Sequence, residues 1–272
     1  MTIAIFLFGL IVGSFLNVVG LRWNSGLGLG GRSFCPACGK RLKFSELIPV
    51  VSFLVLCGKC SSCKSRISPV YPLIEIFTGL VFVTIFNFQF SRLSQFGGQA
   101  IFNEFSPLFI IHYSLFIIIF SIYILILIYD FRHKIIPDEL SYSAILLSLV
   151  YLLTNLPTYQ LIDLLAGPII FGFFALIWLI TRGRAMGFGD AKLGLSIGLI
   201  LGAAHGFSAI ILSFWIGSVI AVLLLIVSRS GTLFKRAKKL TMKSEIPFAP
   251  FMIIGAWLGL IFELDLLHVS LF

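Results

Sequence analysis

Long apolar segments, rather than any short motif, most strongly limit what this chain can fold into. A helix needs about 20 consecutive apolar residues to cross a bilayer, and several segments approach that length. Of the 272 residues, 59% are hydrophobic and only 11% are charged, which lies far outside the range of a soluble domain. We therefore predict an all-α, polytopic membrane protein. We expect about eight transmembrane helices, at residues 2–20, 70–90, 108–129, 141–155, 164–181, 193–205, 207–227 and 247–264.

The basic residues predict how these helices are oriented. An even number of spans places both termini on one side, and cytosolic loops carry an excess of Lys and Arg. The loops predicted to face the cytosol, among them 229–245, hold 19 of the 20 Lys and Arg residues; only Arg92, in the predicted outer loop 91–107, lies elsewhere. Contact with anionic lipid then explains the net charge of +9. No feature of the sequence suggests nucleic-acid binding.

All five cysteines lie in one of these predicted cytosolic loops, and four of them form two Cys-x-x-Cys pairs. The pairs are Cys35 with Cys38 and Cys60 with Cys63. A reducing compartment disfavours disulfides, whereas two such pairs supply the four thiolates of a tetrahedral zinc site. Four thiolates leave no open coordination position, so we predict structural zinc in a small, zinc-ribbon-like insert. Cys57 is left over and is interpreted as a core residue.

The polar, cysteine-containing segment divides the chain into three predicted domains. Residues 1–20 form the first transmembrane helix, 21–68 the cytosolic four-cysteine zinc-binding loop, and 69–272 a seven-helix membrane bundle. The first apolar segment has neither a charged n-region nor a small-residue cleavage site, so we expect a retained helix rather than a signal peptide. Gly9 and Gly13 give this helix a small-xxx-small face suited to close helix packing.

Two aspartates lie where long apolar segments meet basic loops. Asp130 ends one such segment, and Asp190 lies in the sequence Gly-Phe-Gly-Asp-Ala-Lys just before another. A carboxylate near hydrocarbon is costly and by default indicates a functional site. The topology predicts both at the cytosolic edge, where one would hold a proton and the other act as a base. Such a pair can activate water for attack on a peptide carbonyl. The alternative is two unrelated capping residues.

Several nearby residues have more than one interpretation. Gly187 and Gly189 would let backbone and substrate approach closely. Lys192 could tune the acid pair, hold a substrate carbonyl, or face lipid phosphate. Asp138 suits the N-terminus of the fourth predicted span. Glu75, inside the second span, must face the bundle interior or a wet cavity, where it could pair with a cation or contact substrate or cofactor.

The order and spacing of these motifs resemble the type IV prepilin peptidases, a family of membrane aspartic proteases. The resemblance implies that Asp130 and Asp190 form the catalytic dyad of the membrane bundle. The matching segments run along the whole chain, at 13–19, 32–38, 48–50, 60–63, 67–75, 130, 136–138, 186–193 and 246–251.

The same resemblance implies a substrate, a second activity and a location. The expected reaction removes the leader of type IV prepilins or pseudopilins on the cytosolic side of the bacterial inner (cytoplasmic) membrane. Many members also N-methylate the new amino terminus with S-adenosylmethionine, and the four-cysteine loop marks that branch. We therefore expect both activities, although the sequence assigns no residues to that cofactor.

Three other functions stay open at this stage. A GxGD protease of the presenilin or signal-peptide-peptidase type would carry a Pro-Ala-Leu motif near its carboxyl end, and this sequence has none. A membrane transporter with proton-relaying acids would be expected to show repeat symmetry between its halves, and we find none. A methyltransferase with an inactive dyad would leave the prepilin uncut.

Overall fold

The computed structural model describes all residues except 27, 29, 96–106, 155–160, 231–246 and 267–272. Within the described residues the structure is helical, with two isolated β-bridges and no strand, so the predicted all-α class is confirmed. Most of the predicted loops 91–107 and 229–245 lies outside the described residues. The chain divides into two compact units, Met1–Tyr129 (unit 1) and Asp130–Phe272 (unit 2).

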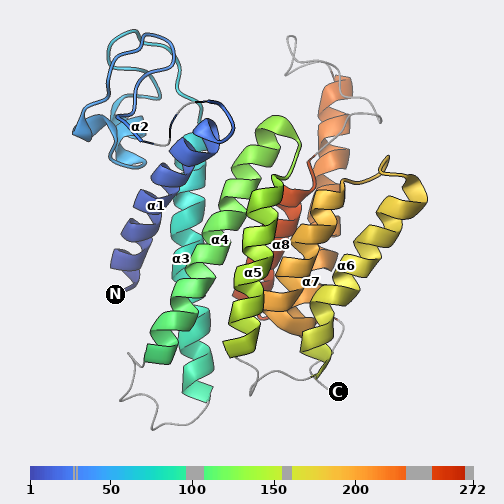
Figure 1. The fold of residues 1–272 in the computed structure, drawn as a ribbon. Helices are drawn as coiled ribbons and strands as arrows, with labels where there is room; N and C mark the ends of the chain where they lie inside the picture. The colour runs from blue at the N-terminus through green and yellow to red at the C-terminus, as the bar shows by residue number, and fades with distance from the viewer. Residues whose placement is uncertain (27, 29, 96–106, 155–160, 231–246, 267–272) are drawn as a thin grey trace. The chain divides into compact units, whose positions relative to one another are not determined.

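Unit 1 contains the first helices of the chain and the cysteine loop (Figure 1). Helix α1 (Thr2–Arg22) packs along α3 (Val70–Gln95). A Cβ atom at Gly9 would lie 2.7 Å from the Cα of Gly79, and one at Gly13 would lie 2.8 Å from the Cα of Glu75. Real Cβ atoms do not approach so closely, so the predicted small-residue face of α1 is confirmed as the site of close helix contact.

The cysteine loop joins α1 to α3 and contains only short helices. These are the 3-10 helix η1 (Phe44–Glu46) and the α-helix α2 (Val51–Val55). Most of helix α4 (Pro107–His133) also belongs to unit 1, where Phe86 and Phe88 of α3 make ring contacts with its Tyr113 and Phe116.

Unit 2 is built around one long helical element, α7 (Phe188–Ser230). Three helices pack against it: α5 (Asp138–Thr154), α6 (Leu161–Thr181) and α8 (Ala249–Ile261). The contact between α6 and α7 is close, because a Cβ atom at Gly198 would lie 2.5 Å from the Cα of Gly167. Small residues thus bring helix backbones together in both units.

Helix α7 is interrupted at Gly202, whose backbone has φ 72° and ψ −170°. The N–H of Ala203, which begins the second half, donates a hydrogen bond of 2.8 Å to Oδ1 of Asp163 in the first turn of α6. A carboxylate in this position satisfies a donor that the helix start leaves free. The predicted spans 193–205 and 207–227 both fall within α7, and the break between its halves lies at Gly202.

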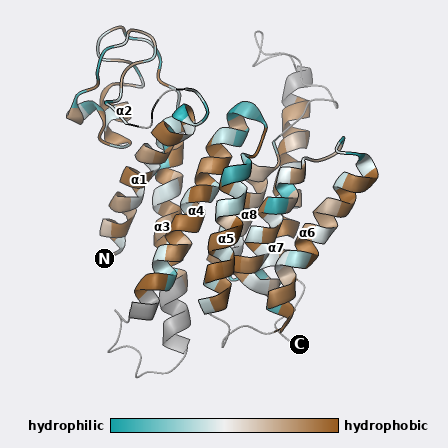
Figure 2. Ribbon diagram, viewed as in Figure 1, coloured by the Kyte–Doolittle hydropathy of each residue, from teal (hydrophilic) through white to brown (hydrophobic). Residues whose placement is uncertain are grey.

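Within the described residues, five helices are long and apolar enough to cross a membrane, as the hydropathy colouring in Figure 2 illustrates. They are Thr2–Arg22, Val70–Phe88, Ile110–His133, Leu161–Thr181 and Phe188–Ile226. The protein is therefore a multi-pass membrane protein. Eight spans is not a confirmed number, because α5 and α8 have only 17 and 13 residues and α7 is one interrupted element. The count of eight stays a prediction.

The break in α7 generates a stability prediction. Gly202→Ala should lower the free energy of unfolding by about 1–3 kcal/mol, since residues with a side chain rarely adopt this backbone conformation. The new Cβ would also lie 2.7 Å from Oδ1 of Asp163. Gly172→Ala is the matched control in α6, because a Cβ there meets nothing within 4 Å. Thermal unfolding of the purified variants in detergent measures the stability of both. Equal unfolding midpoints for Gly202→Ala and Gly172→Ala would contradict the claim that the break in α7 requires glycine at position 202.

Candidate functional site

Unit 2 brings together the two aspartates that the sequence singled out. Asp130 lies in the last turn of α4, and Asp190 lies in the first turn of α7. Both side chains are buried, and they are close enough for the charge of Asp130 to act on Asp190. Residues far apart in the sequence therefore form one acidic site.

Each carboxyl group accepts a backbone hydrogen bond near the start of a helix. The N–H of Ala249, the first residue of α8, donates to Asp130, and the N–H of Gly187 donates to Asp190. A helix N-terminus carries partial positive charge and stabilises an anion. The C-terminal end of α4 disfavours a negative charge at Asp130, and the N-terminus of α8 offsets that effect.

Among the residues that the structure describes, one buried oxygen of this acid pair accepts no hydrogen bond. Within the described residues, Oδ2 of Asp130 is buried and accepts none. Leaving a buried acceptor unpaired is costly, so this oxygen is suited to carry a proton or to accept one from a bound molecule. Two carboxyls arranged in this way can divide the roles of acid and base.

The two glycines of the Gly-x-Gly-Asp turn have different surroundings. A Cβ atom at Gly189 would lie 2.9 Å from the Cβ of Ile136, in the segment that joins α4 to α5. At Gly187 the nearest atom would be Oδ2 of Asp190 at 3.7 Å, an ordinary contact. Gly189 therefore lets the turn with Asp190 pack against the segment that follows Asp130, whereas Gly187 contributes its N–H to Asp190.

Lys192 is buried in the first turn of α7 and forms an ion pair with the exposed carboxylate of Asp138. Its Nζ lies 2.7 Å from Oδ1 of Asp138 and 4.5 Å from the centre of the Tyr142 ring. The lysine side chain is 9% exposed and that of Asp138 is 68% exposed. Asp190 and Lys192 are two residues apart on α7 and therefore do not face each other. The ion pair of Lys192 with Asp138 instead connects the first turn of α7 to the first turn of α5. A buried lysine paired with Asp138 does not match the alternative in which Lys192 faces lipid phosphate.

Glu75 lies in unit 1 and fastens the cysteine loop to the helices. Its Oε2 accepts a 2.7 Å hydrogen bond from the N–H of Val50, and its carboxylate also bonds to the Ser14 side chain in α1. Val50 has φ 60° and ψ −50°, which is unusual for a β-branched residue. The described partners of Glu75 are thus the backbone amide of Val50 and the hydroxyl of Ser14. The hydrogen bond from Glu75 stabilises the strained backbone of Val50 just before α2.

The four paired cysteines converge in unit 1. Their sulfur atoms all lie within 4.8 Å of one another, and the sulfurs of Cys35 and Cys63 are 3.9 Å apart. A tetrahedral ion with metal–sulfur bonds of about 2.3 Å would separate its ligands by roughly 3.8 Å. Cys35, Cys38, Cys60 and Cys63 could therefore hold a metal ion. Cys57 is not part of the cluster and is exposed, so its interpretation as a core residue was wrong.

The two cysteine pairs have the same local backbone structure. In the first, the N–H of Cys35 bonds to Lys40 O and the N–H of Gly39 bonds back to Cys35 O. In the second, the N–H of Cys60 bonds to Ser65 O and the N–H of Lys64 bonds back to Cys60 O. The N–H groups of Ala37 and Cys38 lower the pKa of Cys35 to about 6, which favours the thiolate form needed for metal binding.

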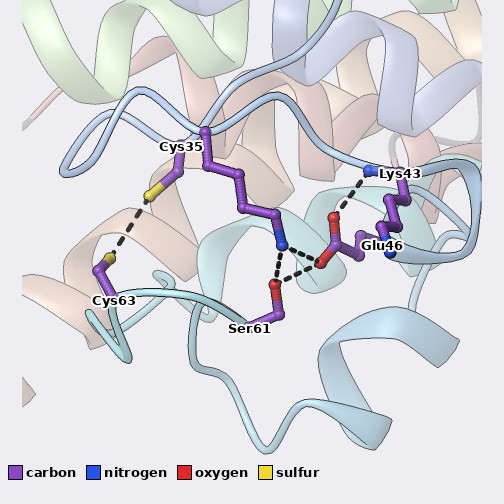
Figure 3. Close-up of polar contacts among 6 residues, drawn as sticks. Cys35, Lys43, Glu46, Ser61 and Cys63 are labelled. Atoms are coloured by element: carbon purple, nitrogen blue, oxygen red, sulfur yellow. Dashed lines mark hydrogen bonds and ion pairs between the residues drawn. The ribbon is translucent and has the colours of Figure 1, made fainter.

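A polar network joins the two pairs, as Figure 3 shows. Glu46 accepts hydrogen bonds from the hydroxyl of Ser61, from the backbone N–H of Lys43 at 2.7 Å and from Nζ of Lys40 at 3.2 Å. The lysine also donates to Ser61 at 2.7 Å. The Ser61 hydroxyl, with the Lys43 amide and Lys40, lowers the pKa of Glu46 to about 2. A single carboxylate thus connects residues that follow the first cysteine pair with a residue inside the second.

Comparison with known proteins finds a family match in each half of the chain. The family described as bacterial peptidase A24 N-terminal domain matches residues 7–88, and the type IV leader peptidase family matches residues 115–226. A prepilin leader peptidase/N-methyltransferase of Bacillus subtilis (strain 168) is 32% identical, over 95% of this chain and 93% of its own length. Its namesake from Stutzerimonas stutzeri is 31% identical, over 93% and 88%. This chain belongs to the type IV leader peptidase family.

The family assignment covers both features described above. The N-terminal match includes the cysteine loop, and the second match includes both aspartates. A third relative, the prepilin leader peptidase/N-methyltransferase of Pseudomonas aeruginosa, is 29% identical over 94% of this chain and 88% of its own length. No solved structure matches the chain at a significant level.

Sequence analysis missed two features of the acid site. One is the start of α8 facing Asp130; Pro250 at the second helical position predicts where a helix begins, but not what its N-terminus faces. The other is the pairing of Lys192 with Asp138. Its only sequence signal is the presence of opposite charges at the starts of two helices, which gives no partner by itself.

The contrast between the two glycines yields a prediction. Gly189→Ala should lower the rate of prepilin cleavage by roughly 10- to 100-fold, because displacing a catalytic group by about 1 Å can cost that much. Gly187→Ala, the matched control, should keep most of the activity, since its methyl group makes only ordinary contacts. A time course of cleavage with detergent-solubilised enzyme measures both. Equal activity of the two variants would show that Gly189 does not position Asp190.

Proposed function

We propose that this chain removes the leader peptide of type IV prepilins or pseudopilins, using Asp130 and Asp190 as an aspartic-protease dyad. The observation that carries the proposal is the meeting of two buried carboxyls from α4 and α7 in one unit. The printed names of the relatives support the substrate. The segregation of Lys and Arg supports a site at the cytosolic face of the bacterial inner membrane.

The two carboxyls can carry out hydrolysis without a metal ion. The ionised carboxylate takes a proton from a water molecule, whose oxygen attacks the carbonyl carbon of the scissile peptide bond. The protonated carboxyl donates its proton to the carbonyl oxygen, which gives a tetrahedral intermediate. The carboxyl that took the water proton then passes it to the nitrogen, the bond to nitrogen breaks, and a hydroxyl of the intermediate returns its proton to the other carboxylate. At the end the pair again shares a single proton.

The surrounding residues hold the two acids in position. The Ala249 and Gly187 N–H groups stabilise negative charge on the pair. Gly189 and the Lys192–Asp138 ion pair fix the turn that carries Asp190. We expect the apolar helix of the prepilin to lie within the bilayer and to present its leader junction at the inner surface, where Asp130 and Asp190 are predicted to lie.

Replacing either acid should abolish cleavage. Asp130→Asn or Asp190→Asn should reduce the cleavage rate by about 10³-fold or more, because members of a catalytic unit are each required. Asp163→Asn is the matched control, since an asparagine oxygen can still accept the hydrogen bond from Ala203. A gel-shift assay of prepilin processing measures all three variants, and thermal unfolding checks that each is folded. Full processing by either dyad variant would refute the proposal.

For the cysteine loop we propose structural zinc and a domain of its own at residues 21–68, between the first helix (1–20) and the peptidase bundle (69–272). The convergence of four sulfurs supports zinc. Four thiolates fill the coordination sphere, so zinc would stabilise the loop and take no part in hydrolysis.

Metal analysis tests the zinc proposal. Purified protein should contain about one zinc ion per chain, and Cys60→Ser should lose most of it, because three thiolates leave a coordination position open. Cys57→Ser, the matched control, should keep its zinc, as Cys57 lies outside the cluster. Absence of zinc from the unmodified protein, with every thiol open to titration, would reject the proposal.

We also propose N-methylation of the new amino terminus, supported by the relatives' names. S-adenosylmethionine would supply the methyl group from its positively charged sulfonium. Among the described residues of unit 1, Glu75 is the buried acid, and it already bonds to Val50 and Ser14. We therefore assign no residues to this cofactor. Mass spectrometry of the cleaved amino terminus, with and without S-adenosylmethionine, tests the activity.

A further inference from the structure

The described part of the cysteine loop contains none of the candidate membrane spans, yet it exposes several apolar side chains. They belong to η1, to α2 and to the turn between these two helices, which contact each other. Three are especially open: Phe44 is 86% exposed, Leu54 67% and Val55 75%. We call this set the apolar patch; its members are Phe44, Leu47, Ile48, Val51, Leu54 and Val55. Exposed apolar groups clustered in this way indicate an interaction surface.

The loop that carries the apolar patch is strongly basic. Between residues 23 and 69 the sequence has seven Lys and Arg residues and one acid, Glu46. That acid already pairs with Lys40, so the other six basic residues have no carboxylate counterpart within the loop, and a zinc ion held by four thiolates would offset only part of their charge. The exposed basic residues are Arg32, Arg41, Lys43, Lys59, Lys64 and Arg66. Apolar side chains beside basic ones are typical of segments that lie in the headgroup region of anionic bilayers.

Both ends of the loop are fixed at the ends of membrane helices. The loop leaves α1 after Arg22 and enters α3 at Val70. The side-chain amide of Asn17 in α1 donates a hydrogen bond to the backbone oxygen of Tyr71 in α3, so these two helix ends adjoin. Glu75 of α3 bonds to the N–H of Val50, the residue immediately before α2. The apolar patch is therefore held close to the ends of two candidate membrane spans.

We propose that the apolar patch inserts into the headgroup region of an anionic bilayer, at the surface where α1 ends and α3 begins. The basic residues of the loop indicate that the patch binds anionic phospholipid. An uncharged apolar peptide helix could cover the apolar side chains of the patch, but it would offer no negative charge to the basic residues around them. Lipid contact by the patch holds the cysteine loop against the membrane. This inference does not depend on the proposed peptidase activity.

Photo-crosslinking in the full-length protein tests the proposal. The probe p-benzoylphenylalanine replaces Phe44 or Val55, one at a time, and Ser62 in a matched control, since Ser62 is exposed but lies outside the apolar patch. The variants are placed in nanodiscs of phosphatidylethanolamine and phosphatidylglycerol and irradiated with and without an added prepilin, and the adducts are identified by mass spectrometry. Thermal unfolding confirms that each variant is folded.

The expected result is lipid adducts at positions 44 and 55 in roughly fivefold excess over position 62. In nanodiscs of phosphatidylcholine alone the yield at these positions should fall by a similar factor, which corresponds to the loss of about one basic residue's attraction to anionic lipid. Adducts only with protein, whether another segment of this chain or an added prepilin, would overturn the proposal. So would equal lipid yields at all three positions, or yields that do not depend on the anionic lipid.

Discussion

The structure of unit 2 depends on how two carboxyl groups are accommodated inside an apolar environment. Charges in such surroundings are costly unless they are paired or hydrogen-bonded. Here each acid accepts a hydrogen bond near a helix N-terminus, Asp190 at the start of α7 and Asp130 at the start of α8. The close contact of Gly189 with Ile136 brings the start of α7 against the segment that follows Asp130. The acid site thus results from helix packing together with the Gly-x-Gly-Asp turn.

In unit 1, the negatively charged groups are stabilised by different interactions. Its four cysteine sulfurs are close enough to share one metal ion, and Glu46 connects residues next to both cysteine pairs through Ser61 and Lys40. The buried carboxylate of Glu75 fastens this loop to the helices at Val50. Cross-links between polar groups therefore give the loop its shape, whereas small residues and apolar packing set the arrangement of the helices.

The sequence predicted the helices better than their partners. Hydropathy placed α5 and α6 within a few residues of their observed limits, because a buried backbone must satisfy its hydrogen bonds within a helix. The break at Gly202 was misplaced by a few residues, since hydropathy is nearly uniform there and only the backbone conformation marks it. The Ala249 amide that faces Asp130, and the Asp138 carboxylate that pairs with Lys192, result from contacts between remote segments. A single sequence carries no pattern for such contacts.

The central claim is that Asp130 and Asp190 act as one unit. Cleavage rates of the two single Asn variants and of the double variant, measured with one prepilin, test it most directly. If the two carboxyls share one reaction, the double variant should be no slower than the slower single variant, because removing either acid already disables the pair. Losses that multiply, so that the double variant is slower by the product of both single effects, would mean that the acids act independently.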